Sequence, residues 1–207
     1  MRGRFISLEG GEGAGKSTQL KALAEALRGR GLEVVETREP GGSPDAEAIR
    51  DLLLRGDVDR WTPEQEALLF AAARSSHVVR TIEPALAQGK WVLSDRFIDS
   101  SLAYQGGAGG VGVDRIMQLH EFGSGGLLPD RTLLLDLPGF DAARRESARD
   151  GDNLDRFGRK SSAYHQALAE TFRSIADGDP DRFRIVNAEG TVEEVTAKLL
   201  AAIEDLL

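Results

Sequence analysis

The sequence predicts an α/β domain in which a five-stranded parallel sheet is covered by helices on both faces. Five short apolar segments alternate with stretches in which apolar residues recur at helical spacing. Near-continuous apolar character is typical of strands buried on both faces, and strands that alternate with helices favour right-handed βαβ units. The predicted strands are Phe5–Leu8, Val34–Thr37, Trp91–Ser94, Thr132–Leu137 and Phe183–Val186.

The predicted helices begin with recognisable capping residues. Ser43 precedes Pro44, a cap residue followed by proline at the first helical position. Residues 62–65, Thr-Pro-Glu-Gln, form a capping box that opens a long helix through about Leu86. Residues 191–194 have similar capping chemistry and open the last helix. The apolar stripes are Leu20, Leu23, Ala24 and Leu27 on the first helix, and Val195, Leu199, Ile203 and Leu206 on the last.

Two segments depart from this alternation. They are the glycine-rich Gly106–Gly112 and the charged Arg144–Lys160. Neither separates regions of different composition, and the sequence contains no internal repeat. We therefore expect both to be loops or mobile flaps on a single domain that spans residues 1–207.

The composition excludes several classes of protein. The chain has 34 Asp and Glu against 26 Lys and Arg, a net charge of −8, which argues against a chain-wide basic surface for nucleic acid or an anionic membrane. It has no cysteine, which excludes disulfides, thiolate zinc sites and cysteine nucleophiles. No apolar run approaches the ~20 residues that span a bilayer, and no signal peptide is recognisable. We expect a cytoplasmic protein.

A phosphate-binding loop follows the first predicted strand. Residues 10–17 match G-x-x-x-x-G-K-S/T in full, between a strand and an amphipathic helix. Backbone N–H groups of such a loop cradle the phosphates of ATP, the lysine reaches the β- and γ-phosphates, and the hydroxyl binds Mg²⁺. The predicted nucleotide-binding residues are Gly10, Gly11, Glu12, Gly13, Ala14, Gly15, Lys16, Ser17 and Thr18.

A second glycine pattern lies in residues 107–112, which contain G-x-G-x-x-G. A dinucleotide site requires this pattern directly after a strand, with an acidic ribose ligand after a second strand. Neither condition is met, so we interpret the segment as a flexible loop. The three histidines form no spaced cluster and predict no metal site.

Two aspartates end predicted strands and are candidate magnesium carboxylates. Asp95 ends the third strand and Asp136 lies in the fourth. Arg96 follows Asp95 directly, which places a phosphate-binding guanidinium beside a metal carboxylate. That pairing suits phosphoryl transfer, so Asp95 is preferred.

Other residues are candidates for binding the phosphoryl acceptor. Arg38 follows the second strand and faces the crevice in which open α/β sheets bind ligands, although a surface arginine paired with a carboxylate is the alternative. Phe70 and Arg74 lie four residues apart and share a helix face, where they could stack on a base and bind its edge, or form core and surface. Tyr104 and Gln105 precede the glycine loop and could be ordinary turn residues.

Together these segments resemble the thymidylate kinase family over nearly the whole chain. The resemblance rests on residues 9–18, Arg38-Glu39-Pro40-Gly41-Gly42 after Thr37, residues 70–74, Asp95-Arg96-Phe97, residues 99–106 and Asp155-Arg156-Phe157. It implies a three-layer P-loop fold with strand order 2-3-1-4-5, and transfer of the γ-phosphoryl group of ATP, with Mg²⁺, to dTMP. It also implies a homodimer.

The resemblance implies a role for each matching residue. Arg38 is similar to the clamp on the dTMP phosphate, Phe70 to the residue that stacks on thymine, and Arg74 to the residue that binds the base edge. Ser101 and Gln105 match further thymine contacts. Tyr104 matches the residue that packs against the deoxyribose, and Glu12 the residue near its 3′-hydroxyl. Lys16, Ser17 and Asp95 match residues around the nucleotide and magnesium. Arg96 matches the residue between the two phosphates, and residues 187–190 match the region that lies against adenine.

Family members keep a catalytic arginine in the P-loop or in a mobile lid. Gly13 and Ala14 occupy the P-loop positions, so the resemblance implies an arginine-rich lid, about residues 144–160, with Arg149 and Arg156 as the catalytic arginines. The lid departs from the family pattern at Gly158, where an acidic residue is usual. Downstream, Tyr164 replaces a phenylalanine and Ala169 a common arginine. A kinase of another nucleoside monophosphate and a nucleotide-binding module without turnover remain alternatives.

Overall fold

The computed structural model describes residues 2–137 and 156–207 and contains the predicted sheet. All five strands are parallel and lie in the order β2-β3-β1-β4-β5, which confirms the expected topology. Each strand agrees with its prediction to within one residue at either end. Their bounds are β1 Phe5–Glu9, β2 Val34–Arg38, β3 Trp91–Asp95, β4 Arg131–Asp136 and β5 Phe183–Asn187.

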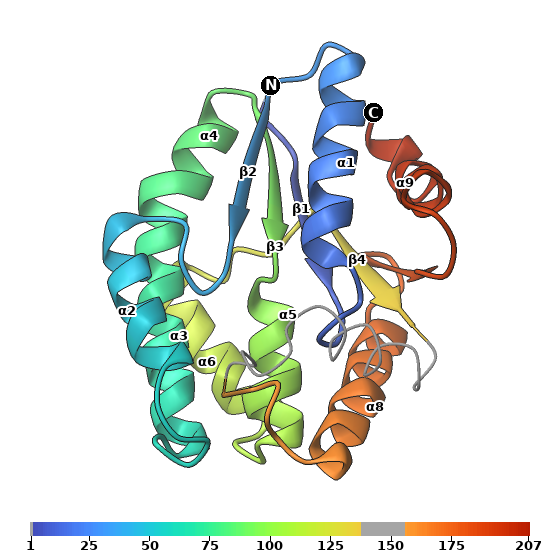
Figure 1. The fold of residues 1–207 in the computed structure, drawn as a ribbon. Helices are drawn as coiled ribbons and strands as arrows, with labels where there is room; N and C mark the ends of the chain where they lie inside the picture. The colour runs from blue at the N-terminus through green and yellow to red at the C-terminus, as the bar shows by residue number, and fades with distance from the viewer. Residues whose placement is uncertain (1, 138–155) are drawn as a thin grey trace.

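The strand register brings the candidate residues to one edge of the sheet. Asp95 pairs with Leu8 of β1 on one side and with Arg38 of β2 on the other. Because all strands point the same way, the P-loop that follows β1 begins at this same edge (Figure 1). The chain termini lie near each other at the opposite end of the molecule (Figure 1).

Alternate side chains of the central strands enter different apolar layers. Ile6 and Leu8 of β1 pack with the helices α1 and α9, whereas Phe5 packs on the other face with α3, α5 and α6. Leu134 of β4 points into a third cluster with α8. The strands are thus buried on both faces, which explains their near-continuous apolar sequence and gives the expected three layers.

The helices follow the predicted order along the chain. The α-helices are α1 Lys16–Gly29, α2 Pro44–Leu54, α3 Pro63–His77, α4 Glu83–Ala87, α5 Ile98–Ser101, α6 Val113–Ser124, α8 Ser162–Gly178 and α9 Val192–Ala201. Two π-helices, η1 Val78–Ile82 and η2 Leu102–Ala108, and a 3₁₀-helix, η3 Glu204–Leu206, complete the described elements.

All three predicted caps are present. The Ser43 hydroxyl accepts a hydrogen bond from the Ala46 amide, and both capping boxes, at Thr62 and Thr191, are complete. These bonds satisfy amide groups that the first helical turn leaves without a partner.

Two local predictions differ from the structure. The long helix from Pro63 toward Leu86 is divided, because η1 separates α3 from α4. The segment Gly106–Gly112 is only partly a loop, since its first three residues belong to η2. Of the predicted lid, residues 144–155 lie outside the described residues.

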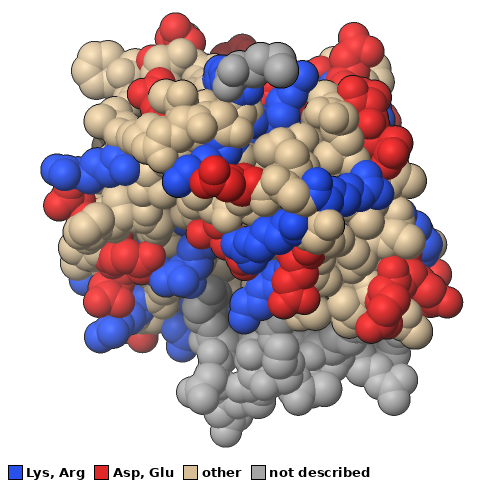
Figure 2. All heavy atoms as spheres, turned by 90° about the horizontal axis from the view of Figure 1, so that it is seen from above, with Lys and Arg blue, Asp and Glu red and all other residues tan. Residues whose placement is uncertain are grey.

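Charges of both signs are interspersed on the face shown in Figure 2, without a large patch of either sign. Within residues 2–137 and 156–207, none of the helices combines the length and the apolar composition needed to cross a bilayer.

Candidate active site

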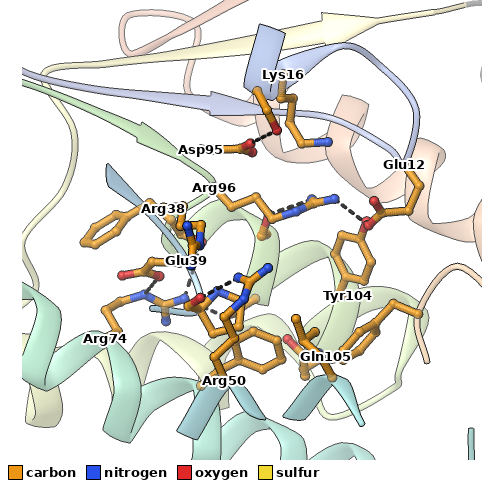
Figure 3. A pocket seen from close by; sticks show the side chains of 18 of the residues that line it. Glu12, Lys16, Arg38, Glu39, Arg50, Arg74, Asp95, Arg96, Tyr104 and Gln105 are labelled. Atoms are coloured by element: carbon orange, nitrogen blue, oxygen red, sulfur yellow. Dashed lines mark hydrogen bonds and ion pairs between the residues drawn. The ribbon is translucent and has the colours of Figure 1, made fainter. Parts of the chain in front are cut away.

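One cavity of about 310 Å³ opens at the carboxyl edge of the sheet and joins the P-loop to the predicted acceptor residues. Figure 3 shows the side chains that converge on it from the P-loop, from the ends of β2 and β3, and from α2, α3 and η2. The lining residues around the P-loop are Glu12, Gly13, Gly15, Lys16, Ser17 and Asp95. The lining residues predicted to bind the acceptor are Arg38, Phe70, Arg74, Ser101, Tyr104 and Gln105. Arg96 also lines the cavity.

The P-loop has the backbone geometry that its glycines predict. Gly10 has φ +137°, and a Cβ atom there would lie 2.6 Å from the Leu135 carbonyl oxygen, so only glycine fits. Lys16 turns back over the loop, and its Nζ donates to the carbonyl oxygens of Gly10 at 3.1 Å and Gly11 at 2.8 Å. Burial and the neighbouring Arg96 lower the pKa of Lys16. The loop therefore holds its lysine in place before any phosphate is bound.

Ser17 and Asp95 meet at the start of α1. The Ser17 hydroxyl donates to a carboxylate oxygen of Asp95 at 2.5 Å. A hydroxyl and a carboxylate are hard oxygen donors, and Mg²⁺ beside a nucleotide takes few protein ligands because phosphates and water supply the rest. The pair therefore fits magnesium. Asp136 instead pairs with Arg173 of α8, at 3.1 Å.

In the described part of the chain, no group of three or more His, Cys, Asp and Glu side chains is arranged to hold a metal ion. This does not conflict with the Ser17–Asp95 site, which has a single carboxylate.

Arg96 connects the two ends of the cavity. It has φ +73°, an unusual left-handed conformation for an arginine, and its guanidinium donates to Gly10, to the Ser100 hydroxyl and to Glu12. Burial by itself would lower the pKa of Arg96, but the facing Glu12 and Tyr104 raise it above its usual value. The guanidinium is therefore a fixed positive charge between the P-loop and the acceptor residues (Figure 3).

Glu12 accepts hydrogen bonds from two side chains in the cavity. Its carboxylate accepts from Arg96 at 2.5 Å and from the Tyr104 hydroxyl at 2.9 Å. Burial raises the pKa of Glu12, but Arg96 and Lys16 outweigh it and hold the pKa at about 2. Burial and the nearby Glu12 raise the pKa of Tyr104, although Arg96 opposes this. At neutral pH the cavity therefore contains an ionised Glu12 and a protonated Tyr104 hydroxyl.

Arg38 is half-exposed and already has an anionic partner. One terminal nitrogen lies 3.1 and 3.0 Å from the two carboxylate oxygens of Glu47, on α2. The same carboxylate accepts from the Gly42 amide at 3.0 Å. Arg50, also on α2, lines the cavity and donates to the Pro40 carbonyl at 2.6 Å.

Arg74 is held by a buried network at the end of the cavity away from the P-loop. Its Nε donates to Glu39 at 2.8 Å, and one terminal nitrogen donates to the Ser101 hydroxyl at 2.8 Å. The second oxygen of Glu39 lies 2.9 Å from Nδ1 of His77, whose Nε2 lies 2.7 Å from the Thr37 hydroxyl. A charge-assisted network of this kind fixes one rotamer of the arginine.

Two aromatic rings and a glutamine side chain complete the end of the cavity away from the P-loop. The Phe70 and Phe157 rings lie 5.9 Å apart, and both line the cavity. Gln105 donates to Glu66 at 3.3 Å through its Nε2 atom. Its Oε1 atom is buried and has no hydrogen-bond partner among the described residues. Gln105 therefore keeps one acceptor that no described side chain or backbone group satisfies.

A second cavity of about 220 Å³ lies on the other side of the P-loop. It is lined by Gly13, Ala14, Gly15, Thr18 and Gln19, and by Ala188 and Gly190 after β5. The predicted adenine region, residues 187–190, therefore lies beside the start of α1.

The structure places Arg156 differently from the sequence prediction. Its side chain is fully buried and donates to the carbonyl oxygens of Leu53, Asp57 and Val58 and, at 2.7 Å, to Glu66. Arg156 is not among the cavity-lining residues, although its neighbour Phe157 is. Arg149, the other predicted catalytic arginine of the lid, lies outside the described residues.

Sequence reasoning missed some of the residues in this wall. Arg50, Leu54 and Phe157 line the cavity, and Glu39 and Pro40 complete the part next to β2. Glu39 and Phe157 belong to the motifs quoted above, so the sequence could have indicated them. Arg50 lies on a helix outside these motifs, and nothing in the sequence shows which way its side chain faces.

Comparisons with known proteins agree with this geometry. The family model described as thymidylate kinase matches residues 8–199. A thymidylate kinase of Rhizorhabdus wittichii is 62% identical over 207 residues, the full length of both chains. One from Caulobacter vibrioides is 48% identical over 198 residues, 96% of this chain and 94% of the relative.

A solved structure supports the same conclusion. The crystal structure of thymidylate kinase from Ehrlichia chaffeensis matches with a TM-score of 0.79 and 31% identity, over 99% of each chain. Residues 8–199, which the family model matches, include the P-loop and all the other residues that line the cavity. The chain belongs to the thymidylate kinase family.

Proposed function

We propose that the cavity is the place where this chain transfers the γ-phosphoryl group of ATP to dTMP, giving dTDP and ADP. The reaction is that of its family, a dTMP kinase acting with ATP and Mg²⁺ in dTDP synthesis. The observation that carries the proposal is that a single cavity joins the P-loop to a wall of arginine, phenylalanine and glutamine side chains. Donor and acceptor can therefore meet without crossing bulk water.

The P-loop end of the cavity suits ATP. Backbone amides of residues 10–15 and Lys16 bind the phosphates, and Ser17 with Asp95 holds the magnesium ion. Magnesium, when bound, neutralises charge on the phosphate oxygens. Arg96 faces the gap between donor and acceptor and stabilises the charge on the phosphoryl group in transfer. Arg149, from the lid, supplies the further catalytic arginine.

The opposite end suits dTMP. Arg38 binds its phosphate in place of Glu47, while Phe70 stacks on thymine and Arg74 donates to the base edge. Ser101 and Gln105 provide further contacts to thymine. Tyr104 packs against the deoxyribose, with Glu12 at its 3′-hydroxyl. Arg156 acts away from these contacts, as an anchor for the described end of the predicted lid, residues 156–160.

No strong general base is needed for this transfer. The acceptor phosphate has a second pKa of about 6, so an oxygen of dTMP is already ionised at neutral pH. Catalysis then consists of positioning the two phosphates in line and neutralising their charge. Transfer is direct, without a covalent enzyme intermediate.

The test is ADP release measured with dTMP, dUMP, dGMP, dAMP and dCMP as separate acceptors. We expect the highest kcat/KM with dTMP and only slow ADP release without an acceptor. Release that does not depend on dTMP would contradict the proposal. A higher kcat/KM with a purine acceptor would instead indicate a kinase of another monophosphate.

We also propose a homodimer formed through α3, η1 and α6. Leu68, Val79 and Phe122 are exposed apolar residues on these elements, and Phe122 is 95% exposed. The neighbouring Gly123 lies close to Ala71 of α3, so the two helices share one apolar surface. A face of this kind pairs with its own copy across a twofold axis.

Sedimentation velocity tests the homodimer. We expect the wild type to sediment as a dimer and Phe122→Asp to shift it toward monomer. Val113→Asp, an exposed apolar position at the first residue of α6, is the matched control and should leave the dimer intact. A monomeric wild type would contradict the proposal.

The single domain and the location of the protein remain proposals as well. Residues 1–207 form one domain, since one sheet orders segments from both ends of the chain. A chain without cysteine fits the reducing cytoplasm, where ATP and dTMP are available.

A further inference from the structure

Gln105 lines the cavity, its buried Oε1 atom has no partner among the described residues, and the orientation of its amide decides which ligand group that oxygen can bind. The amide carries a donor on Nε2 and an acceptor on Oε1, and rotation by half a turn exchanges them. The N3 position of thymine is a donor, whereas N3 of cytosine is an acceptor. A fixed amide can therefore distinguish the two bases, and a freely rotating one cannot.

Glu66 of α3 is the group that the Gln105 amide faces. Glu66 is buried, and Nε2 of Gln105 donates to its Oε2 atom at 3.3 Å. An ionised carboxylate is an acceptor only, so the reversed amide would place two oxygens against each other without a hydrogen. The opposite orientation is thus unfavourable against the Glu66 carboxylate.

Two cations balance that charge. Arg156 donates to Oε1 of Glu66 at 2.7 Å, and Nζ of Lys160 lies 3.7 Å from Oε2. Arg156 is itself fixed by three backbone carbonyl groups, that of Leu53 in the last turn of α2 and those of Asp57 and Val58 between α2 and α3. A buried carboxylate paired in this way has a fixed position and only one oxygen left for Gln105.

We propose that Glu66 is a positioning residue that fixes the Gln105 amide with Oε1 free to accept a hydrogen bond from N3–H of thymine. The inference rests on the proposed binding of dTMP in this cavity. It assigns Arg156 and Lys160 a role in base selection, through the carboxylate that they hold. Arg74 selects the base independently at its other edge, so Glu66 accounts for part of the selectivity.

The test compares kcat/KM for dTMP and for 5-methyl-dCMP, which keeps the methyl group and reverses the hydrogen-bonding character at N3. In Glu66→Gln the amide at position 66 accepts either orientation of Gln105, so the discrimination against 5-methyl-dCMP should fall about 10- to 100-fold. Arg74 is unchanged in both proteins, so its contribution cancels.

A paired substitution provides the rescue. E66Q/Q105E keeps the net charge and places a carboxylate at position 105, which accepts from N3–H in every rotamer. We expect it to regain most of the lost discrimination. Asp205→Asn, which removes the ion-pair partner of the buried Arg131 outside the cavity, is the control and should lower stability without changing discrimination.

Gln105→Leu keeps the test decisive if Glu66→Gln fails to fold. It removes the acceptor with no change of charge, and kcat/KM for dTMP should fall about 10- to 100-fold. Unchanged discrimination in a folded Glu66→Gln protein, or unchanged dTMP turnover in Gln105→Leu, would overturn the inference. Failure of the wild type to phosphorylate dTMP would instead overturn the proposed function.

Discussion

At the scale of single residues, the site consists of charges that already have partners before a substrate binds. Arg96 is paired with Glu12, Arg38 with Glu47, and Arg74 with Glu39. The pairs differ in burial, since the Arg74–Glu39 pair is buried and the Arg38–Glu47 pair is half-exposed. The buried pair therefore serves as a rigid fixture, and the exposed pair can open for a ligand at little cost.

Arg38→Ala should weaken dTMP binding far more than ATP binding. The guanidinium lies at the acceptor end, and loss of one charge-assisted contact to phosphate amounts to roughly 1.5–3 kcal/mol. Isothermal titration with dTMP and with a non-hydrolysable ATP analogue measures both affinities. Equal losses for the two ligands would contradict the assigned role, and Arg28→Ala, an exposed arginine of α1 paired with Glu36, is the control.

Glu9, at the end of β1, makes the stability of the protein depend on pH. Burial and the nearby Asp99 raise its pKa from 4.5 to about 8. A raised carboxyl pKa means that the folded state binds the proton more tightly, so this contribution to stability is complete below pH 4.5 and is lost as the pH rises through 8. The carboxyl group accepts from the Phe97 amide and from Ser100.

Glu9→Gln should therefore gain stability relative to wild type as the pH rises. The amide is neutral at every pH and keeps an oxygen for the Phe97 amide. The difference in unfolding free energy should be small at pH 5 and reach a few kcal/mol at pH 9. Urea titrations at both pH values measure it. A difference that does not change with pH would show that Glu9 is ionised in the folded protein throughout this range.

At the scale of elements, the connection between α2 and α3 is fastened from a distant part of the chain. Arg156 binds two of its carbonyl groups and that of Leu53 in the last turn of α2, and Arg159 binds the Gly56 carbonyl at 2.7 Å. An irregular segment has carbonyl groups without helical or sheet partners, and a buried guanidinium satisfies several at once. The α2–α3 connection and residues 156–160, the described end of the predicted lid, are therefore one structural unit.

Arg156→Met should destabilise the fold by about 3–5 kcal/mol, because it leaves Glu66 and several carbonyl groups without their main donor. Arg156→Lys keeps the charge and should lose less. Urea unfolding measures both variants, and kcat is determined at saturating ATP and dTMP. Unchanged stability with a 100-fold lower kcat would instead support the catalytic role that the sequence predicted.

The capping box of α3 provides a second test at this scale. The Thr62 hydroxyl accepts from the Gln65 amide, and the Gln65 side chain accepts from the Thr62 amide. Thr62→Ala should lower the free energy of unfolding by about 1 kcal/mol. Thr62→Ser retains the hydroxyl and is the control. An equal loss in both variants would show that the methyl group, rather than the cap, stabilises the helix.

At the scale of the whole molecule, the fold joins the two ends of the chain in one sheet. β4 lies between β1 and β5, so residues near both termini depend on the same core. We therefore expect the molecule to unfold in a single cooperative step.

The two tryptophans report on this cooperativity. Trp91 is buried in β3, and Trp61 lies between α2 and α3 with its Nε1 bonded to the Leu52 carbonyl. Trp61→Phe and Trp91→Phe each retain one tryptophan. In each variant, the urea midpoint measured by fluorescence of that tryptophan should equal the midpoint measured by far-ultraviolet circular dichroism. A Trp61 signal lost well before the helical signal would contradict the single domain.

Much of this fold could be predicted from the sequence because each element has its own local signal. Strands such as Trp91–Asp95 are apolar on both faces, and Ser43, Thr62 and Thr191 mark helix starts with side chains that can cap them. The π-helices could not be predicted, because segments of five and seven residues are too short to separate their period from that of an α-helix.

The site was predicted in its residue types more than in its geometry. Lys16, Ser17 and Asp95 lie together at the P-loop, as their motifs predict, because a strand end and a glycine loop fix where such side chains lie. The interior position of Arg156 depends on carbonyl groups a hundred residues away in sequence, which no local pattern contains. Arg50 was missed for the same reason, since its partner is a backbone oxygen of another loop.

The pairing of Arg38 with Glu47 gives the enzyme a built-in competitor. In the free protein the carboxylate occupies the arginine that a phosphate needs, so each incoming anion must exchange with it. The apparent affinity of the site is lowered by the fraction of molecules in which the pair is closed. A nucleotide compensates through its base and sugar contacts, whereas inorganic phosphate has none. At the proposed dTMP site, the exposed ion pair therefore lowers occupancy by a simple anion by a modest factor, while the base and sugar contacts of a nucleoside monophosphate keep its own occupancy high.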